Sequence, residues 1–104
     1  MRHHLIVVSM LLAAWLLLPQ GTAYGGDVFQ GKKLYKSYCE SCHGPKGRGR
    51  MPGAPNFTRG QGLVGADTTL FETIRSGKQA MPGFRGVLDD HQILDVISYI
   101  RTFF

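Results

Sequence analysis

The segment Cys39-Glu40-Ser41-Cys42-His43 decides the fold of this chain, and it holds both cysteines of the 104 residues. Two cysteines three positions apart at a helix end can reach the two vinyl groups along one edge of a haem and form thioethers. The histidine that follows then lies under the iron. C-x-x-C-H is the attachment signature of c-type haem. The sequence therefore predicts one haem c per chain, attached through Cys39 and Cys42, with His43 as an axial ligand.

Three other uses of this cysteine pair fit the sequence less well. A thioredoxin-like redox pair belongs beside a βαβ pattern, and the sequence has no alternating β pattern. A zinc site needs four nitrogen or sulfur ligands, and beyond the N-terminal region the one further candidate is His91. A disulfide across two intervening residues would add little loop-closure stabilisation and would leave His43 unexplained.

The first 23 residues are typical of a secretory signal peptide. A short basic start at residues 2–4 precedes a largely apolar run over residues 5–18, and Gly21-Thr22-Ala23 supplies the small residues of a cleavage site. The run is shorter than the roughly 20 residues of a usual membrane span, which favours cleavage over an uncleaved anchor. We therefore expect residues 1–23 to be removed and residues 24–104 to form one periplasmic domain.

Size and charge narrow the function classes further. Removing 23 of the 104 residues leaves 81, with eleven basic and seven acidic side chains and a formal charge of +4. So small a domain has a marginal core and usually needs a disulfide, a metal or another covalent aid. The modest charge and the export signal argue against nucleic-acid binding.

The first helical pattern runs from Asp27, a good N-cap, to about Cys39. Gly31 lies inside it at a cost of about 1 kcal/mol relative to alanine, which close approach of another backbone would explain. Residues 44–65 then contain seven glycines and three prolines, so they form an extended loop. Such a long loop in a small domain is expected to wrap around something.

Two more helical patterns follow, and the predicted fold class is all-α. Thr69 and Glu72 form a capping box for a short helix that ends at Gly77. Asp89 begins the last helix, with Gln92 as its capping partner. The buried stripe expected on this helix is Ile93, Val96, Ile97, Ile100, Phe103 and Phe104.

Residues 27–104 resemble the class I monohaem cytochromes c. The resemblance implies a small cytochrome c fold, with three to four helices and loops wrapped around one covalently attached haem. It also implies that the first and last helices cross near Gly31 and Tyr99. The matching pieces, in the family's order, are Gly31-x-x-x-Tyr35, Cys39-x-x-Cys42-His43-Gly44, Ala54-Pro55-Asn56-Phe57, Ile74-Arg75-x-Gly77, Met81-Pro82-Gly83-Phe84, Leu88-Asp89-Asp90 and Tyr99-Ile100-Arg101.

Two methionines of the domain can supply the sixth ligand of the iron, Met51 and Met81, and each begins a Met-Pro-Gly sequence. Met51 lies eight residues after His43, so its loop would have to cross to the opposite haem face and return. Met81 follows the second helix, and the last helix can pack behind it. The resemblance also places the ligand in the Met-Pro loop before the last helix. We therefore predict Met81 as the ligand and keep Met51 as the alternative.

The resemblance gives Pro55 a supporting role. In the family, the carbonyl of a proline in this loop accepts a hydrogen bond from the free ring nitrogen of the axial histidine. Pro55 lies twelve residues after His43 and matches that position. Such a bond would fix the orientation of the imidazole and raise its basicity. The alternative is an ordinary turn proline.

Histidine and methionine ligation together predict an electron carrier and not an enzyme. With both axial positions filled, the iron has no open position for substrate or oxygen, and methionine raises the reduction potential. The predicted function is a periplasmic one-electron carrier that cycles between Fe(II) and Fe(III). The alternative is a dedicated haem c subunit of a larger periplasmic oxidoreductase complex. An enzymatic or sensory role would require loss of the methionine ligand.

The expected partners are redox proteins: a periplasmic dehydrogenase, a membrane respiratory complex, or a terminal reductase or oxidase. Membrane contact is expected only if the signal stays uncleaved. A basic rim around the haem edge would steer an acidic partner, although an ordinary solvated loop explains the same charges equally well. The basic residues concerned are Lys46, Arg48, Arg50, Arg59, Lys78 and Arg85.

Overall fold

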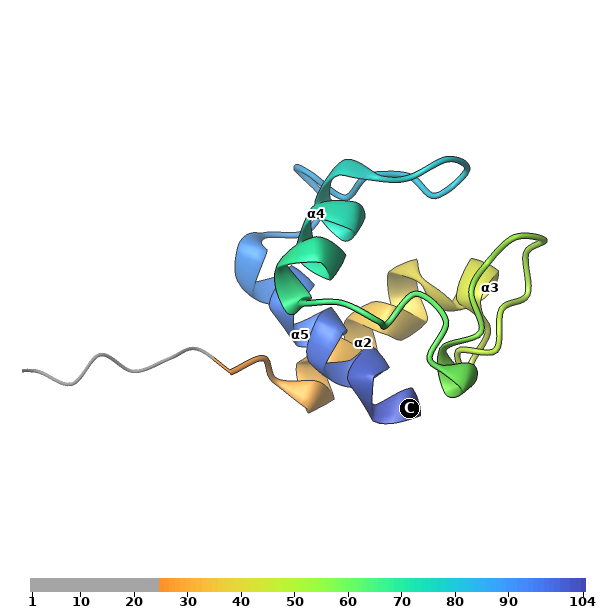
Figure 1. Cartoon of the computed structure of the whole chain (residues 1–104). Helices are drawn as coiled ribbons and strands as arrows, with labels where there is room; N and C mark the ends of the chain where they lie inside the picture. Colours follow the sequence, from red (N-terminus) through yellow and green to blue (C-terminus); the bar gives the residue numbers. More distant parts are fainter. Residues whose placement is uncertain (1–24) are drawn as a thin grey trace, which may run out of the picture.

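A computed structural model describes residues 25–104, so the predicted signal peptide and its cleavage after residue 23 lie outside the described residues. Within that range the chain is helical, which confirms the predicted class, and it pairs as β only at two isolated bridges. None of the described helices is long and apolar enough to cross a membrane. The elements are α2 (Val28–Tyr38), α3 (Glu40–His43), the 3-10 turn η1 (Phe57–Arg59), α4 (Asp67–Ser76), α5 (Asp90–Ile100) and the 3-10 turn η2 (Arg101–Phe103) (Figure 1).

The helices α2 and α5 cross in direct backbone contact. A Cβ atom on Gly31 would lie 1.9 Å from the carbonyl oxygen of Asp95 and 2.9 Å from the Cβ of Tyr99. The predicted crossing near Gly31 and Tyr99 is therefore confirmed. A second glycine, Gly26, makes a similar contact, because its Cβ would lie 2.3 Å from the carbonyl oxygen of Leu94. The sequence does not reveal this second contact, since Gly26 precedes the helix.

The N-terminus of α2 is capped locally and also fastened to α5. The carboxylate of Asp27 accepts from the amides of Phe29 and Gln30, at 2.9 and 3.2 Å, as the predicted N-cap requires. The amide of Asp27 itself donates to the carboxylate of Asp95 at 2.8 Å, across 68 residues of sequence. Asp95 is buried on α5, so its carboxylate joins the start of the first helix to the middle of the last.

The predicted start of α5 is confirmed, and one residue of its predicted stripe is wrong. Asp89 and Gln92 form the reciprocal capping box, with both bonds at 2.8–2.9 Å. The stripe holds as far as Ile100, all of it buried, and Phe103 is half-buried. Phe104 is 78% exposed. The chain tightens into η2 after Ile100, and the closer 3-10 spacing carries residue 104 away from the α-helical stripe.

The predicted capping box of α4 is also wrong. The helix begins at Asp67, with Ala66 as an N-cap that has no side-chain bond, so Thr69 lies inside the helix. The N-cap is three residues earlier than the local pattern indicates, and Arg101 binds this part of the chain through the carbonyls of Leu63 and Gly65 and the carboxylate of Asp67. The predicted end is confirmed, because the amide of Gly77 donates to the carbonyl of Thr73 and Gly77 has a φ of +82°.

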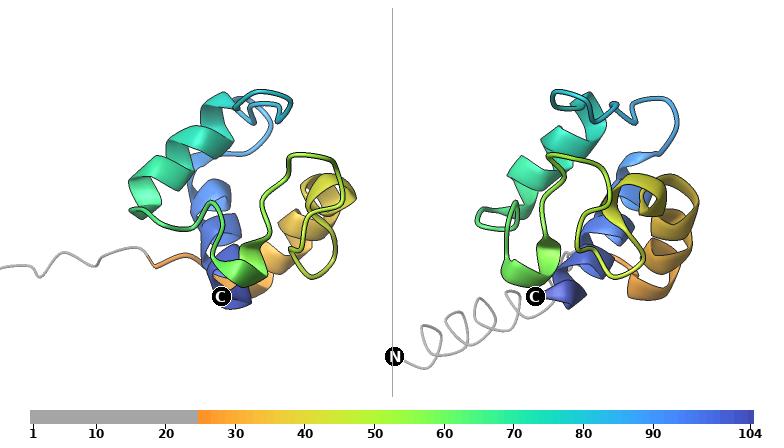
Figure 2. Two further views of the ribbon diagram at one scale, coloured as in Figure 1. Left: turned by 45° about the vertical axis from the view of Figure 1, so that its right-hand side comes forward. Right: turned by 90° about the vertical axis from the view of Figure 1, so that its right-hand side faces the viewer.

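Segments outside the α-helices also contribute side chains to the core. Tyr35 of α2, Ile74 of α4 and four apolar residues of α5 are buried, and loop residues pack with them. Figure 2 shows α5 lying between α4 and α2, with the 44–65 loop running along one side of the three helices. The buried residues outside the α-helices are Phe57, Leu63, Phe84 and Leu88. The glycine-rich loop therefore wraps around packed aromatic and aliphatic side chains.

Candidate functional site

The cysteine pair lies where two helices meet. Cys39 is both the C-cap of α2 and the N-cap of α3, and Cys42 and His43 are the last two residues of α3. The amide of His43 donates to the carbonyl of Cys39 at 2.9 Å, which closes one helical turn around the pair. Residues three apart on a helical turn lie on the same side. Both cysteines are free thiols and half-buried, so they are available for attachment to one group.

The protonation of Cys39 argues against a redox-active thiol pair. Burial, with a smaller effect of the charge on Cys42, raises the pKa of the Cys39 thiol to about 11. A reactive cysteine needs a lowered pKa, because the thiolate is the nucleophile. Nor do three or more His, Cys, Asp or Glu side chains come together anywhere in residues 25–104 in a way that could hold a metal ion. The thioredoxin-like and zinc alternatives therefore lose support.

The side chain of His43 is half-buried, and its Nδ1 atom is fully enclosed. Burial lowers its pKa, which favours the neutral form that binds metals. Its Nδ1 atom is buried and has no hydrogen-bond partner among the described residues, which is costly for a polar group. Two thiols and one half-buried imidazole within five residues are the donors that haem c requires. The described residues therefore fit this group.

Phe57 fixes the plane of the His43 ring. The two rings stack with centroids 5.0 Å apart and an interplanar angle of 15°. The ring of Phe103 is also stacked with that of Phe57, with centroids 6.4 Å apart and an interplanar angle of 4°. Sequence reasoning did not identify Phe57 or Phe103 as site residues. The one available signal is the position of Phe57 at the end of the Ala54-Pro55-Asn56-Phe57 match to the family.

The 44–65 loop is held against α3 through its backbone. The amide of Gly49 donates to the carbonyl of His43 at 2.8 Å, and the amide of Met51 donates to the carbonyl of Cys42 at 2.9 Å. The amide of Phe57 donates to the carbonyl of Gly47 at 2.7 Å, which brings the Phe57 ring under His43. The glycines allow this path, since Gly47 and Gly49 have φ values of +71° and +85°.

The two candidate methionines lie in different environments. The backbone of Met51 is bonded to Cys42, beside the attachment segment, and its side chain is 46% exposed. Met81 packs against the hydrophobic core. Its amide and carbonyl exchange hydrogen bonds with Lys78 at 2.9 and 3.1 Å, which fixes the loop that carries it. These environments favour Met81, and its ligation stays a prediction.

The predicted bond from His43 to the carbonyl of Pro55 is not formed in this geometry. The Nδ1 atom has no partner among the described residues, and the Pro55 carbonyl oxygen lies 3.3 Å from where a Cβ on Gly49 would be. The carbonyls of this segment therefore pack against the returning loop backbone. The role of Pro55 as the acceptor stays a prediction.

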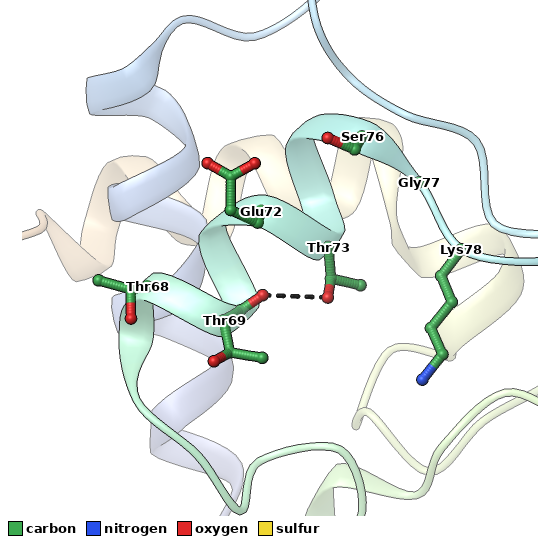
Figure 3. A pocket seen from close by; sticks show the side chains of 7 residues that line it. All are labelled: Thr68, Thr69, Glu72, Thr73, Ser76, Gly77 and Lys78. Carbon is green, nitrogen blue, oxygen red and sulfur yellow. Dashed lines mark hydrogen bonds between the residues drawn. The ribbon is translucent and has the colours of Figure 1, made fainter.

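A separate hollow of about 540 Å³ lies along one face of α4 (Figure 3). In Figure 3 the side chains of Thr69, Thr73 and Lys78 point downward from the ribbon, and that of Glu72 points upward. The hollow is open to solvent, and none of the predicted site residues lines it. Its lining residues are Thr68, Thr69, Glu72, Thr73, Ser76, Gly77 and Lys78.

Replacing Tyr35 by phenylalanine tests how the attachment segment is anchored. The hydroxyl of Tyr35 donates to the carbonyl of Gly44 at 2.6 Å in a buried bond, and burial raises the pKa of this phenol above its usual range. Tyr35→Phe leaves that carbonyl with one donor, the amide of Gly47 at 3.1 Å, so we expect the free energy of unfolding to fall by about 0.5–1.5 kcal/mol, the net value of one hydrogen bond. Denaturant unfolding measures this. Tyr38→Phe is the control, since that side chain is 44% exposed, and equal losses in both variants would refute the anchoring role.

Comparison with known proteins identifies the family. The family model described as "Cytochrome C oxidase, cbb3-type, subunit III" matches residues 26–100. The chain is 37% identical over 84 residues to the cbb3-type cytochrome c oxidase subunit FixP of Bradyrhizobium diazoefficiens, a match that covers 78% of this chain and 29% of that protein. The chain therefore spans less than a third of the length of this relative.

A second relative and one solved structure match over most of their own length. Cytochrome c6 of Synechococcus sp. is 30% identical over 101 residues, covering 92% of this chain and 85% of that protein. The structure of cytochrome c6 from the diatom Phaeodactylum tricornutum superimposes with a TM-score of 0.59 and 24% identity, over 74% of this chain and 93% of that one, which shows the fold. The chain belongs to the monohaem c-type cytochromes, related to cytochrome c6 and to the haem domains of cbb3 oxidase subunit III.

Proposed function

We propose that this protein is a one-electron carrier with one haem c attached through Cys39 and Cys42. His43 and Met81 would ligate the iron, and the haem would supply reversible exchange of one electron between Fe(II) and Fe(III). The observation that carries the proposal is the single helical turn that holds two thiols and a half-buried imidazole whose Nδ1 atom is enclosed and has no partner among the described residues.

The chain's own residues orient and shield the site. Phe57 stacks on His43 and limits rotation of the imidazole. The hydroxyl of Tyr35 donates to the carbonyl of Gly44, and this bond holds the backbone directly after His43. Met81 lies in the loop that follows α4, and its side chain packs against the hydrophobic core. With His43 and Met81 both bound, no position on the iron is open to substrate, which supports a carrier over an enzyme.

Location and assembly form the second part of the proposal. The signal-like residues 1–23 support a periplasmic location. The similarity to FixP supports a second candidate function, a haem domain held within a larger oxidoreductase complex. Gel filtration of extract from the native cell distinguishes the two. A small, freely eluting haem protein supports the diffusing carrier, and a stable large complex supports the subunit.

A redox-titrated absorption spectrum, joined to mass spectrometry, tests haem attachment and ligation together. We expect a chain mass that includes one haem and survives denaturation, a one-electron titration curve, and slow carbon monoxide binding by the reduced protein. A chain without covalent haem would overturn the proposal. Rapid carbon monoxide binding would instead show an open iron, which would contradict Met81 ligation and support a sensory or enzymatic role.

The basic loop that follows His43 is the proposed docking rim for acidic redox partners. Lys46, Arg48 and Arg50 are exposed there. Replacing all three by glutamine should lower the second-order rate constant of oxidation by ferricyanide, a small anion, by up to about tenfold at low ionic strength. Added salt should erase the difference. Stopped-flow kinetics measures this rate.

A matched charge control separates the rim from the net charge. Lys32, Lys33 and Lys36 on α2 are equally exposed, and their replacement by glutamine removes the same charge. We expect this control variant to slow oxidation far less than the loop variant. Equal slowing in the two variants would show that net charge, and not the loop, governs the encounter.

A further inference from the structure

Arg101 binds one short stretch of chain with its whole guanidinium group. Its Nη1 donates to the carbonyl of Leu63 at 2.6 Å, and its Nη2 donates to the carbonyl of Gly65 at 2.7 Å. Its Nε and Nη2 also contact one carboxylate oxygen of Asp67, at 3.1 and 3.0 Å. Since Arg101 directly follows α5, these contacts fasten the residues before α4 to the end of α5.

The residues that Arg101 binds lead directly into α4 and the loop after it, which carries Met81. The amides of Phe84 and Arg85 donate to the carbonyls of Ile74 and Arg75, at 2.9 and 3.1 Å, so the Met81 loop folds back along α4. The packing there is tight as well, because a Cβ on Gly83 would lie 2.7 Å from the Ser76 backbone. The helix and its loop therefore form one unit, and a shift at the start of α4 is transmitted to Met81.

We propose that Arg101 is a positioning residue that holds the α4 unit against α5 and thereby keeps Met81 at the iron. The inference rests on the proposed ligation by Met81. Figure 2 shows α4 separated from α2 by α5, so contacts to α5 and its C-terminal extension hold the unit in place. The clamp of Arg101 lies at the N-terminal end of α4, whereas Met81 follows its C-terminal end.

The carbonyl contacts are expected to matter more than the ion pair. The side chain of Asp67 is 63% exposed, and exposed ion pairs contribute little. The bond to the carbonyl of Leu63 is part-buried and charge-assisted, which makes it stronger than a neutral bond. A lysine cannot reproduce the planar fork of donors that reaches three acceptors at once. Arg101→Lys should therefore lose most of the positioning effect although it keeps the charge.

Imidazole binding to the ferric holoprotein tests the proposal without any partner protein. Added imidazole can occupy the iron only while Met81 is dissociated, so its apparent affinity reports how firmly Met81 is held. We expect Arg101→Gln and Arg101→Lys to bind imidazole roughly tenfold more tightly than the unaltered protein. Asp67→Asn should change the affinity less than about threefold. The control Lys33→Gln, at an exposed lysine of α2, should leave it unchanged.

Amide hydrogen exchange supplies a second readout. In Arg101→Gln the amides of Gly77 and Phe84, which belong to the α4 unit, should exchange faster, while that of Gly31 at the helix crossing should not change. Unchanged imidazole affinity in Arg101→Gln would overturn the positioning role. Equal acceleration at all three amides would also overturn it, because it would indicate general destabilisation.

The variant Met81→Ala separates failure of this inference from failure of the proposed function. If Met81→Ala leaves imidazole affinity unchanged, Met81 is not the ligand and the proposed ligation fails. If Met81→Ala tightens imidazole binding and the Arg101 variants do not, the ligation stands and only the positioning role is wrong.

Discussion

Replacing Met81 by alanine should lower the reduction potential by an amount on the order of 0.2 V, within the roughly 0.8 V over which axial ligands set haem potentials. Methionine sulfur favours the reduced iron, so its loss favours the oxidised form. The same change should open the sixth position, and the reduced variant should bind carbon monoxide rapidly. Potentiometric titration and stopped-flow absorption measure the two effects.

Met51→Ala is the matched control for this prediction. Both methionines begin a Met-Pro-Gly sequence. Met51, however, is 46% exposed, and its backbone amide donates a hydrogen bond to the carbonyl of Cys42. We expect the control variant to keep the potential and the slow carbon monoxide binding of the unaltered protein. If Met51→Ala lowered the potential and Met81→Ala did not, the ligand assignment would have to be reversed.

Replacing Gly31 by alanine should lower the free energy of unfolding by about 1–2 kcal/mol, because the overpacking cost exceeds the gain in helix propensity. Alanine is the better helix former, which alone would stabilise α2 by about 1 kcal/mol. The new methyl group would lie 1.9 Å from the carbonyl oxygen of Asp95, which belongs to the backbone of α5 and cannot rotate away. The helices must therefore separate, and overpacking of this kind costs about 1–3 kcal/mol and occasionally more. Denaturant unfolding of the holoprotein measures the net effect.

Gly25→Ala supplies the control for the helix crossing. A Cβ atom on Gly25 would have no neighbour within 4 Å, so this change should leave the unfolding free energy nearly unaltered. Gly26→Ala should fall between the two, because its methyl group would meet Leu94 near the beginning of α2, where the chain can move more easily. Equal stability of Gly31→Ala and Gly25→Ala would contradict the close crossing of α2 and α5.

Some tertiary features of the site are not visible in local sequence. The fit of Phe57 against His43 requires the loop to return and bond Phe57 to Gly47, ten residues earlier. The capping box at Thr69 is chemically reasonable by itself, yet α4 starts earlier, next to a segment that Arg101 binds through the carbonyls of Leu63 and Gly65 from more than 30 residues away. The exposure of Phe104 depends on the change from α-helix to 3-10 turn after Ile100, which the apolar pattern does not reveal.

The sequence by itself determined the features that depend on neighbours within about one helical turn. The spacing of Cys39, Cys42 and His43, the N-cap Asp27 and the capping box at Asp89 are all of this kind, because the interacting groups lie two to four residues apart. These local features were sufficient to predict an all-helical haem domain.

The tertiary structure alone decided how these pieces are held together. Two hydrogen bonds join distant parts of the chain. One links Asp27 to Asp95 across 68 positions, and the other links Arg101 to Leu63 across 38. The physical reason is that such bonds form only after the chain has paid the entropy of closing long loops, so no local pattern encodes them. They set the angle of α2 on α5 and the place of α4, and through α4 the position of Met81.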